Sequence, residues 1–372
     1  MTTISKSINS SSERTSKSKP KSATKWISGE GEPGMVSIIV PTFERVELLQ
    51  ECVESLLEQT YRPIEIIVVE NSSEDTARES MTRLADSAAE GIEVTYLHRP
   101  GGGAQRARNL GALESRGEFL VFMDDDDVTS VDFISSRVSA IESVPHANLA
   151  YGSWMRFFPK GSEYELIDMK DIVPGPATPW QPRIGFLLQG TLLRRELVSR
   201  VGPWKKGLRK SQDLDFKARL LSDDTCVPAH TSNGIVFYRM HDDSITGKLD
   251  AEKMDNHVDV IQEVEALSIE RDDYEENRLP LAEFLWSNAM WLYAKGDFAR
   301  GNFVLHRARF HWPDIYRKHG GMTNLLHRVG LEFAIGPLYY LLSRFKRALG
   351  MSQPRVEATV AKLPTHASLS IS

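Results

Sequence analysis

The stretch VSIIVPTF, residues 36–43, gives the first clear indication of the fold. It begins with an apolar, β-branched run that Pro41 stops, a pattern typical of a buried strand that enters a loop. Apolar residues then recur at helical spacing over residues 49–57, and a second apolar run, residues 64–69, follows Pro63. This order predicts a βαβ unit.

The alternation of strand and helix continues along the chain. Ser72 and Asp75 form an S-x-x-D pattern that predicts the start of a capped helix. A third strand is expected at residues 92–97, a helix at about residues 104–115 and a fourth strand at residues 119–123. We therefore expect an α/β fold whose sheet is mostly parallel and flanked by helices.

Composition divides the chain into four parts. Residues 1–34 are rich in Ser and Lys and predict a disordered tail, whereas residues 35–250 carry the α/β pattern. Residues 251–350 are rich in helix formers and predict a helical C-terminal extension, and residues 351–372 predict a second tail. Prolines crowd residues 174–182 and predict a loop there.

Charge and cysteine content exclude several classes of protein. The formal net charge is -6, from 45 basic and 51 acidic residues, which argues against a general nucleic-acid binder. The two cysteines, Cys52 and Cys226, are too few for a disulfide framework and favour a reducing compartment. The sequence contains neither a secretory signal nor an apolar run of the ~18 residues that a transmembrane helix needs. A cytoplasmic protein, with peripheral contact to the inner face of the plasma membrane as an option, is expected.

Four consecutive aspartates, residues 124–127, follow the fourth strand directly. Carboxylates this close repel one another and need full solvation or a cation. In an extended chain Asp124 and Asp126 point to one side and Asp125 and Asp127 to the other. A D-x-D pair at the carboxyl end of a strand suits Mg²⁺ or Mn²⁺ bound to a nucleoside diphosphate. The alternative is a solvated acidic turn in which Asp127 or Thr129 caps the next helix.

Several motifs together resemble family 2 glycosyltransferases of the GT-A fold, which has a Rossmann-like sheet. They are, in order, VSIIVPTF at residues 36–43, EIIVVENSSED at 65–75, ARNLG at 107–111 and FMDDDD at 122–127. Their order and spacing also fit, and the resemblance covers about residues 36–246. Several motifs in the correct order are far more specific than any one of them.

The resemblance implies roles for individual residues in binding a nucleotide and a metal. The residues that would contact the donor nucleotide are Pro41, Thr42, Phe43, Asn71, Arg108, Asp124 and Asp125. Those that would hold Mg²⁺ or Mn²⁺ on the diphosphate are Asp126, Asp127 and His241. The family more often has aspartate where Asn71 stands, and an amide reads several bases, so the base of the donor stays open.

The segment KSQDLDF, residues 210–216, resembles the family segment in which an acidic residue opens a helix and acts as catalytic base. Asp213 matches that position. A sugar hydroxyl is a weak nucleophile, so a carboxylate within hydrogen-bond reach is needed to take its proton. Asp215 lies on another face of the same helix, so only one of the two can line the site.

The resemblance predicts an inverting, metal-dependent glycosyltransferase. It would move a sugar from a nucleoside diphosphate sugar to a hydroxyl of a glycan or a lipid-linked acceptor, in polysaccharide or glycoconjugate synthesis. Two alternatives are a sugar-phosphate nucleotidyltransferase and a non-catalytic relative that binds sugar nucleotides. The helical stretch at residues 325–349 combines leucines with Arg and Lys, which suits either a membrane-surface helix or ordinary core packing.

Overall fold

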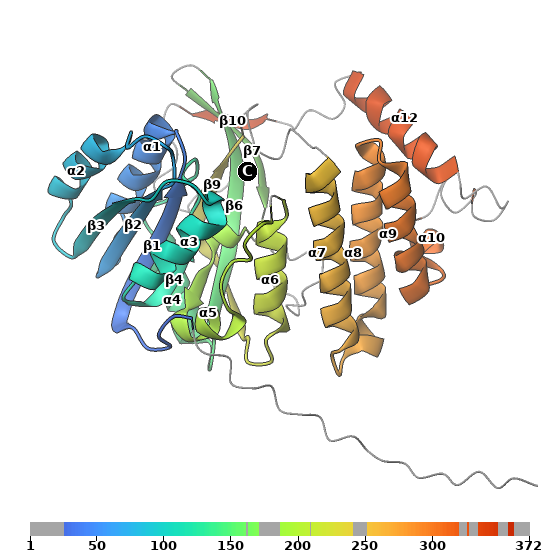
Figure 1. The fold of residues 1–372 in the computed structure, drawn as a ribbon, viewed down its shortest axis with the longest axis horizontal. Helices are drawn as coiled ribbons and strands as arrows, with labels where there is room; N and C mark the ends of the chain where they lie inside the picture. Colours follow the sequence, from blue (N-terminus) through green and yellow to red (C-terminus); the bar gives the residue numbers. More distant parts are fainter. Residues whose placement is uncertain are drawn as a thin grey trace, which may run out of the picture.

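The computed structural model describes residues 26–160, 163–170, 187–208, 210–240, 251–319, 326, 334–348 and 356–360. Its strands form a ten-stranded sheet with helices packed on both faces. A group of helices that begins at residue 251 stands beside this α/β part (Figure 1). The predicted loop at residues 174–182 lies outside the described residues.

The first half of the sheet is built from βαβ units. Its strands are β1 (Glu32–Thr42), β2 (Ile64–Glu70), β3 (Ile92–His98) and β4 (Gly117–Phe122), connected by helices α1 (Val46–Leu57), α2 (Arg78–Asp86) and α3 (Gly103–Glu114). They lie in the order β3-β2-β1-β4, and each neighbouring pair is parallel. This part confirms the predicted α/β alternation.

Strand β1 is buried from Met35 to Thr42, and its residues there are mostly apolar because both faces of the strand are covered. Val36, Ile38 and Val40 pack in the cluster that contains Leu49 of α1. Ile39, on the opposite face, packs in the cluster that contains Ala112 of α3. The carboxyl ends of β1 and β4 lie next to each other at one edge of a three-layer structure.

Beyond β4 the sheet is mixed. Its elements are β5 (Val128–Thr129), α4 (Phe133–Ser143), β6 (Leu149–Lys160), β7 (Glu163–Lys170), a 3₁₀ turn (Leu188–Gly190), β8 (Leu192–Arg194), α5 (Arg195–Val201), α6 (Gln212–Ser222) and β9 (Pro228–Arg239). Only β6 and β9 are parallel there, and the remaining pairs are antiparallel. The expected mostly parallel sheet is thus wrong for this half. The reason is that β6 and β7 follow each other as a hairpin, whereas parallel strands need a long crossover.

Parts of the two expected tails, residues 1–34 and 351–372, are folded. The Trp26 indole nitrogen donates to the Val198 carbonyl of α5 at 3.0 Å, and the Ser199 hydroxyl donates to the Ile27 carbonyl at 2.9 Å. Ile27 is 5% exposed. At the other end β10 (Val356–Val360) pairs antiparallel with β7. Residues 26–34 and 356–360 therefore belong to the folded protein.

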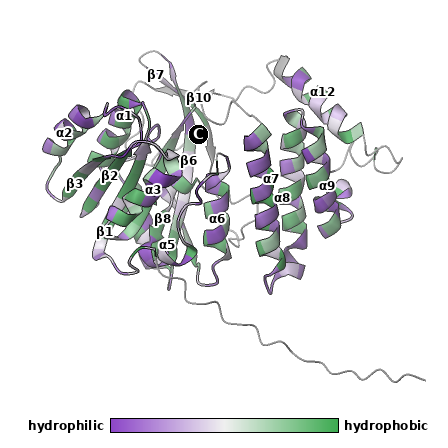
Figure 2. Cartoon of the chain, viewed as in Figure 1, coloured by the Kyte–Doolittle hydropathy of each residue, from purple (hydrophilic) through white to green (hydrophobic). Residues whose placement is uncertain are grey.

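The helices after residue 250 are α7 (Ala251–Ile269), α8 (Tyr274–Ala294), α9 (Phe298–His311), α10 (Ile315–Lys318) and α12 (Ile335–Ala348). They share a hydrophobic cluster of their own, which Leu214 and Ala218 of α6 join. Figure 2 shows apolar and polar residues alternating along α7, α8 and α9, as expected for helices that pack side by side. In the part of the chain that the structure describes, none of the helices is both long and apolar enough to cross a bilayer.

Candidate active site at the carboxyl edge of the sheet

The four aspartates form a turn directly after β4. The backbone N–H of Asp127 donates to the Asp124 carbonyl at 3.4 Å, so the chain is not extended here. This turn brings carboxylate oxygens of Asp124, Asp126 and Asp127 within 4.8 Å of one another. The expected alternation, with Asp127 on the side away from Asp124 and Asp126, is therefore wrong. We call Asp124, Asp126 and Asp127 the carboxylate cluster. Asp125 is not part of it.

Asp127 is the most buried member of the carboxylate cluster. Its side chain is fully buried, and its Oδ1 accepts from the backbone N–H of Arg239 at 3.0 Å. Its Oδ2 has no hydrogen-bond partner among the described residues. Burial, reinforced by the charges of Asp126 and Asp124, raises the pKa of Asp127 well above its usual value. A buried carboxylate oxygen without a donor, beside two more carboxylates, fits a bound divalent cation.

Arg239, at the end of β9, contacts the turn of residues 124–127. Its Nε donates to the Asp126 carbonyl at 2.8 Å, and its guanidinium pairs with Glu51 of α1. The guanidinium also lies over the Phe157 ring, 4.7 Å from the ring centroid. Sequence reasoning gave Arg239 no role, although the resemblance places His241, two residues further on, beside Asp126 and Asp127.

Asp125 joins the ends of β4 and β1. Its Oδ2 accepts from the Thr42 hydroxyl at 2.6 Å, and Arg45 bridges Asp125 and Asp126 at 3.4 and 2.9 Å. Burial raises the pKa of Asp125 to about 6, although the Thr42 hydrogen bond opposes that shift. Thr42 and Asp125 thus bond to each other at the edge of the candidate site.

Arg108 lies between the carboxylate cluster and helix α6. Its NH2 donates to Asp124 Oδ1 at 2.6 Å, and its NH1 donates to Gln212 Oε1 at 3.0 Å. The guanidinium lies 4.4 Å from the centroid of the Trp204 ring. Burial lowers the pKa of Arg108, but the charges of Asp124 and Asp213 outweigh it and the net shift is upward. Gln189 donates to the other oxygen of Asp124.

Asp213 stands in the first turn of α6. Burial raises its pKa, the positive charge of Arg108 opposes that rise, and the negative charge of Asp124 adds to it. Asp213 therefore shares the electrostatic environment of the carboxylate cluster. One helical turn further on, the charge of Asp213 also acts on Lys217, whose pKa burial lowers. Lys217 is a neighbour that sequence reasoning did not identify.

Asp215 faces the other way. It is 3% exposed and forms ion pairs with Lys205 at 2.8 Å and Arg219 at 2.7 Å. These contacts tie α6 to the segment that precedes it. The structure thus places Asp213 and Asp215 on different faces of α6, as their spacing predicts.

The remaining nucleotide candidates lie around the end of β1. Pro41 is buried, whereas the Phe43 ring is 52% exposed. The Asn71 amide nitrogen donates to the Thr42 carbonyl at 2.7 Å, and its oxygen accepts from the Gly103 N–H at 3.2 Å. Asn71 therefore links β1 to the N-terminus of α3, and its contact with a base stays a prediction. His241 lies outside the described residues.

The predicted capping box at Ser72 and Asp75 is wrong. Helix α2 begins only at Arg78 and has no side-chain cap. The Ser72 hydroxyl instead donates to Glu70 Oε1 at 2.8 Å, and Asp75 accepts from the Tyr96 hydroxyl at 2.7 Å. These bonds fix the loop after β2, which orients Asn71.

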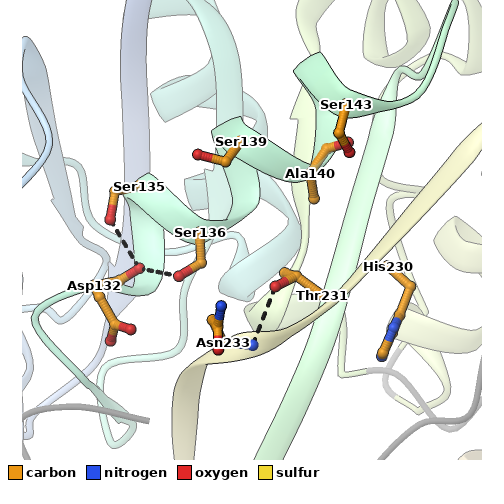
Figure 3. Close-up of a pocket in the computed structure, with 9 residues that line it drawn as sticks. All are labelled: Asp132, Ser135, Ser136, Ser139, Ala140, Ser143, His230, Thr231 and Asn233. Atoms are coloured by element: carbon orange, nitrogen blue, oxygen red, sulfur yellow. Dashed lines mark hydrogen bonds between the residues drawn. The ribbon is translucent and has the colours of Figure 1, made fainter.

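A shallow groove of about 510 Å³ lies elsewhere, between α4 and the start of β9 (Figure 3). The residues that line it are Asp132, Ser135, Ser136, Ser139, Ala140, Ser143, His230, Thr231 and Asn233. Its hydroxyls bond locally, for example Ser136 to the Asp132 carbonyl at 2.6 Å. Because Thr231 and Arg239 are at opposite ends of β9, this groove is separate from the carboxylate cluster.

The fold and its acidic turn define an α/β domain of the GT-A type. A crystal structure of S. aureus TarS 1–349 with UDP-GlcNAc superposes with a TM-score of 0.57, over 85% of this chain and 92% of that one, at 18% identity. Residues 37–211 match the family Glycosyl transferase family 2.

Relatives in sequence are named glycosyltransferases. An uncharacterized glycosyltransferase of Haemophilus influenzae is 24% identical over 246 residues, 64% of this chain and 79% of that one. Glycosyltransferase GlyG of Streptococcus pneumoniae is 27% identical over 182 residues, 45% of this chain and 59% of that one. An uncharacterized glycosyltransferase of Rickettsia felis matches over only 36% of its own length.

Proposed function

We propose that this protein transfers a sugar from a nucleoside diphosphate sugar to an acceptor hydroxyl, with inversion at the anomeric carbon. The observation that carries the proposal is the convergence of Asp213 and the carboxylate cluster on Arg108, from segments far apart in the sequence. A base and a diphosphate-binding group within one electrostatic environment are what a direct displacement needs. TarS, which shares the fold, was solved with UDP-GlcNAc, which supports a nucleotide-sugar donor.

Asp213 is the proposed catalytic base. Burial and Asp124 raise its pKa, and a carboxylate of raised pKa is a stronger base for a sugar hydroxyl. Arg108 opposes part of this shift and so favours the ionised carboxylate. The deprotonated hydroxyl then attacks the anomeric carbon from the face opposite the leaving diphosphate, so the configuration inverts.

The end of β1 is the proposed nucleotide pocket. The exposed Phe43 ring offers a surface on which a base can stack, and Pro41 and Thr42 form the adjoining wall. Asn71, Asp124 and Asp125 are the proposed polar contacts to the base and ribose, with Arg108 toward the nucleotide. The amide of Asn71 can pair with several bases, so the base is left to experiment.

Asp126 and Asp127, together with Asp124, are the proposed ligands of Mg²⁺ or Mn²⁺, with His241 as a further candidate. The partnerless Oδ2 of Asp127 supports this assignment. A bound divalent cation supplies Lewis-acid neutralisation of the charge on the departing diphosphate. We further propose a glycan or lipid-linked acceptor and a role in polysaccharide or glycoconjugate synthesis.

A thermal-shift panel of uridine, guanosine and thymidine diphosphate sugars, each with Mn²⁺, tests the donor. A ligand at 100 times its dissociation constant adds about 2.7 kcal/mol to the free energy of unfolding, so one donor should raise the melting temperature above the others. Release of the nucleoside diphosphate from that donor then separates an enzyme from a non-catalytic binding relative. Donor binding without any turnover, with water or with acceptor, would favour the non-catalytic relative.

A further inference from the structure

Helix α12 packs on the helical extension through one face only. Ile335 is buried, and Gly336 lies so close to the Tyr293 ring that an added Cβ would come within 2.7 Å of it. Tyr340 packs edge-on against Phe298 with the ring centroids 5.7 Å apart. These contacts fix the orientation of α12 on the outer side of α8 and α9 (Figure 1).

The opposite face of α12 is apolar and exposed. Leu341 is 62% exposed, Leu342 46% and Phe345 61%, with the half-buried Leu338 completing the row. Positions 338, 341, 342 and 345 follow the i, i+3, i+4, i+7 spacing of one helix face. Soluble proteins rarely leave several large apolar side chains together in water, so this outer face has the character of a binding surface.

Basic residues flank that outer face. Arg344 and Lys346 are exposed and stand one residue before and after Phe345, so they project on either side of the apolar row. Helix α12 contains no acidic residue. Residues 298–348 contain nine Lys and Arg and two Asp and Glu, a formal charge of +7, although the whole chain carries -6. The C-terminal part of the chain is therefore basic in sequence, although Arg300, Arg307 and Lys318 form ion pairs with acidic residues of the same helical extension.

We propose that the outer face of α12 docks on an anionic lipid surface. A helix in the plane of the membrane buries its apolar face among the acyl chains while flanking Lys and Arg reach the headgroups. At 14 residues α12 is too short to span a bilayer, which needs about 20. The basic residues of α12, with no acidic residue on the same helix, favour anionic lipid over a second copy of this chain, because two such helix faces repel each other. This inference does not depend on the proposed chemistry.

Vesicle sedimentation with the full chain tests the proposal. Vesicles of equal parts phosphatidylcholine and phosphatidylglycerol should retain the protein, and vesicles of phosphatidylcholine alone should retain at least tenfold less. Replacing the apolar row (Leu341→Ser, Leu342→Ser, Phe345→Ser) should abolish retention, and Arg344→Glu with Lys346→Glu should lower it at least tenfold on the anionic vesicles. Each basic residue near such a surface contributes roughly a fivefold gain in partition.

Leu113→Ser is the matched control, because Leu113 is 58% exposed on α3, away from α12, and should leave retention unchanged. Circular dichroism and light scattering on every variant separate loss of docking from unfolding. Retention that survives the apolar replacements, or absence of retention on anionic vesicles, overturns the proposal. A dimer mass that the same replacements reduce to 41.9 kDa also overturns it, since a second copy would then cover this face.

Discussion

Asp213 and Asp215 are two residues apart on α6, yet their surroundings are opposite. Asp213 faces Arg108 and Asp124 at the candidate active site, whereas Asp215 is buried between Lys205 and Arg219. The first is placed to act on a substrate and the second to hold α6 in position. Substituting each in turn should therefore give different signatures.

We expect Asp213→Asn to lower the rate of sugar transfer by at least about 100-fold, the usual cost of losing a general base. The amide keeps the shape of the side chain but cannot accept the proton. Donor affinity and the melting temperature should stay close to those of the wild type. Single-turnover transfer to a working acceptor measures the chemical step without interference from product release.

Asp215→Asn is the matched control and should show the reverse. It weakens the ion pairs of the buried Asp215 with the partly exposed Lys205 and Arg219, which lowers the free energy of unfolding by about 1–3 kcal/mol. Turnover per folded molecule should fall far less than in Asp213→Asn. Normal turnover in Asp213→Asn would remove the proposed base, whatever the control shows.

The partnerless Oδ2 of Asp127 leads to a prediction about metal binding. Asp127→Asn should weaken Mn²⁺ binding in the presence of nucleoside diphosphate at least tenfold, because an amide oxygen carries no charge. Titration calorimetry before and after EDTA treatment measures this affinity. Asp132→Asn, a nearby carboxylate outside the carboxylate cluster, should bind Mn²⁺ like the wild type. Equal affinities for all three proteins would count against Asp127 as a ligand.

At the scale of elements, the segment before β1 is a structural part of the α/β domain. Ile27 is 5% exposed in the cluster that contains Leu197 and Val198 of α5, and Ser199 donates to its carbonyl. This short segment therefore anchors β1 to α5. Its composition suggested a tail because local sequence does not show that its apolar contacts are with residues far along the chain.

Ile27→Ala should lower the free energy of unfolding by about 2–5 kcal/mol, since it removes a buried side chain and leaves a cavity. Urea unfolding monitored by tryptophan fluorescence gives the difference. Ser28→Ala, at the exposed neighbouring position, should change stability by no more than about 0.5 kcal/mol. If the two variants are equally stable, the packing of residues 26–31 on α5 contributes nothing.

At the scale of the whole molecule, His257 lies where α7 meets the α/β part. Its Nδ1 is 2.7 Å from the Ser211 hydroxyl at the start of α6, and its ring lies against Trp291 of α8. Burial, with a smaller contribution from the charge of Lys210, lowers the pKa of His257 to about 4. A neutral His257 is thus part of the contact between the helical extension and α6.

This lowered pKa predicts that acid weakens the fold. His257 binds a proton near pH 6.5 in the unfolded chain and near pH 4 in the folded one. Its contribution to the free energy of unfolding is therefore complete above pH 6.5 and decreases progressively below it. By about pH 5 the free energy of unfolding should have fallen by about 2 kcal/mol. Urea unfolding across this range should show a smaller acid loss for His257→Gln than for the wild type. The exposed control His306→Gln should follow the wild type, and parallel curves for all three would exclude His257 as the cause.

The alternation of strands and helices in the first half of the sheet, the parallel pairing there and the position of the acidic turn were predictable from the sequence, whereas the strand order was not. These predictions follow from local physics: a β-branched run between breakers forms a buried strand, and residues at a strand's carboxyl end meet at one edge of a parallel sheet. The separation of Asp213 from Asp215 followed likewise from the 3.6-residue period of a helix.

The side chains that surround those carboxylates are brought there by long-range packing, which only the three-dimensional structure shows. Arg239, Gln189 and Trp204 reach Asp126, Asp124 and Arg108 across long stretches of chain. The antiparallel half of the sheet and the anchoring of residues 26–34 were likewise not predictable from local patterns. Such contacts depend on how distant strands and helices pack, because their partners are brought together by burial of a shared core and no local spacing encodes it.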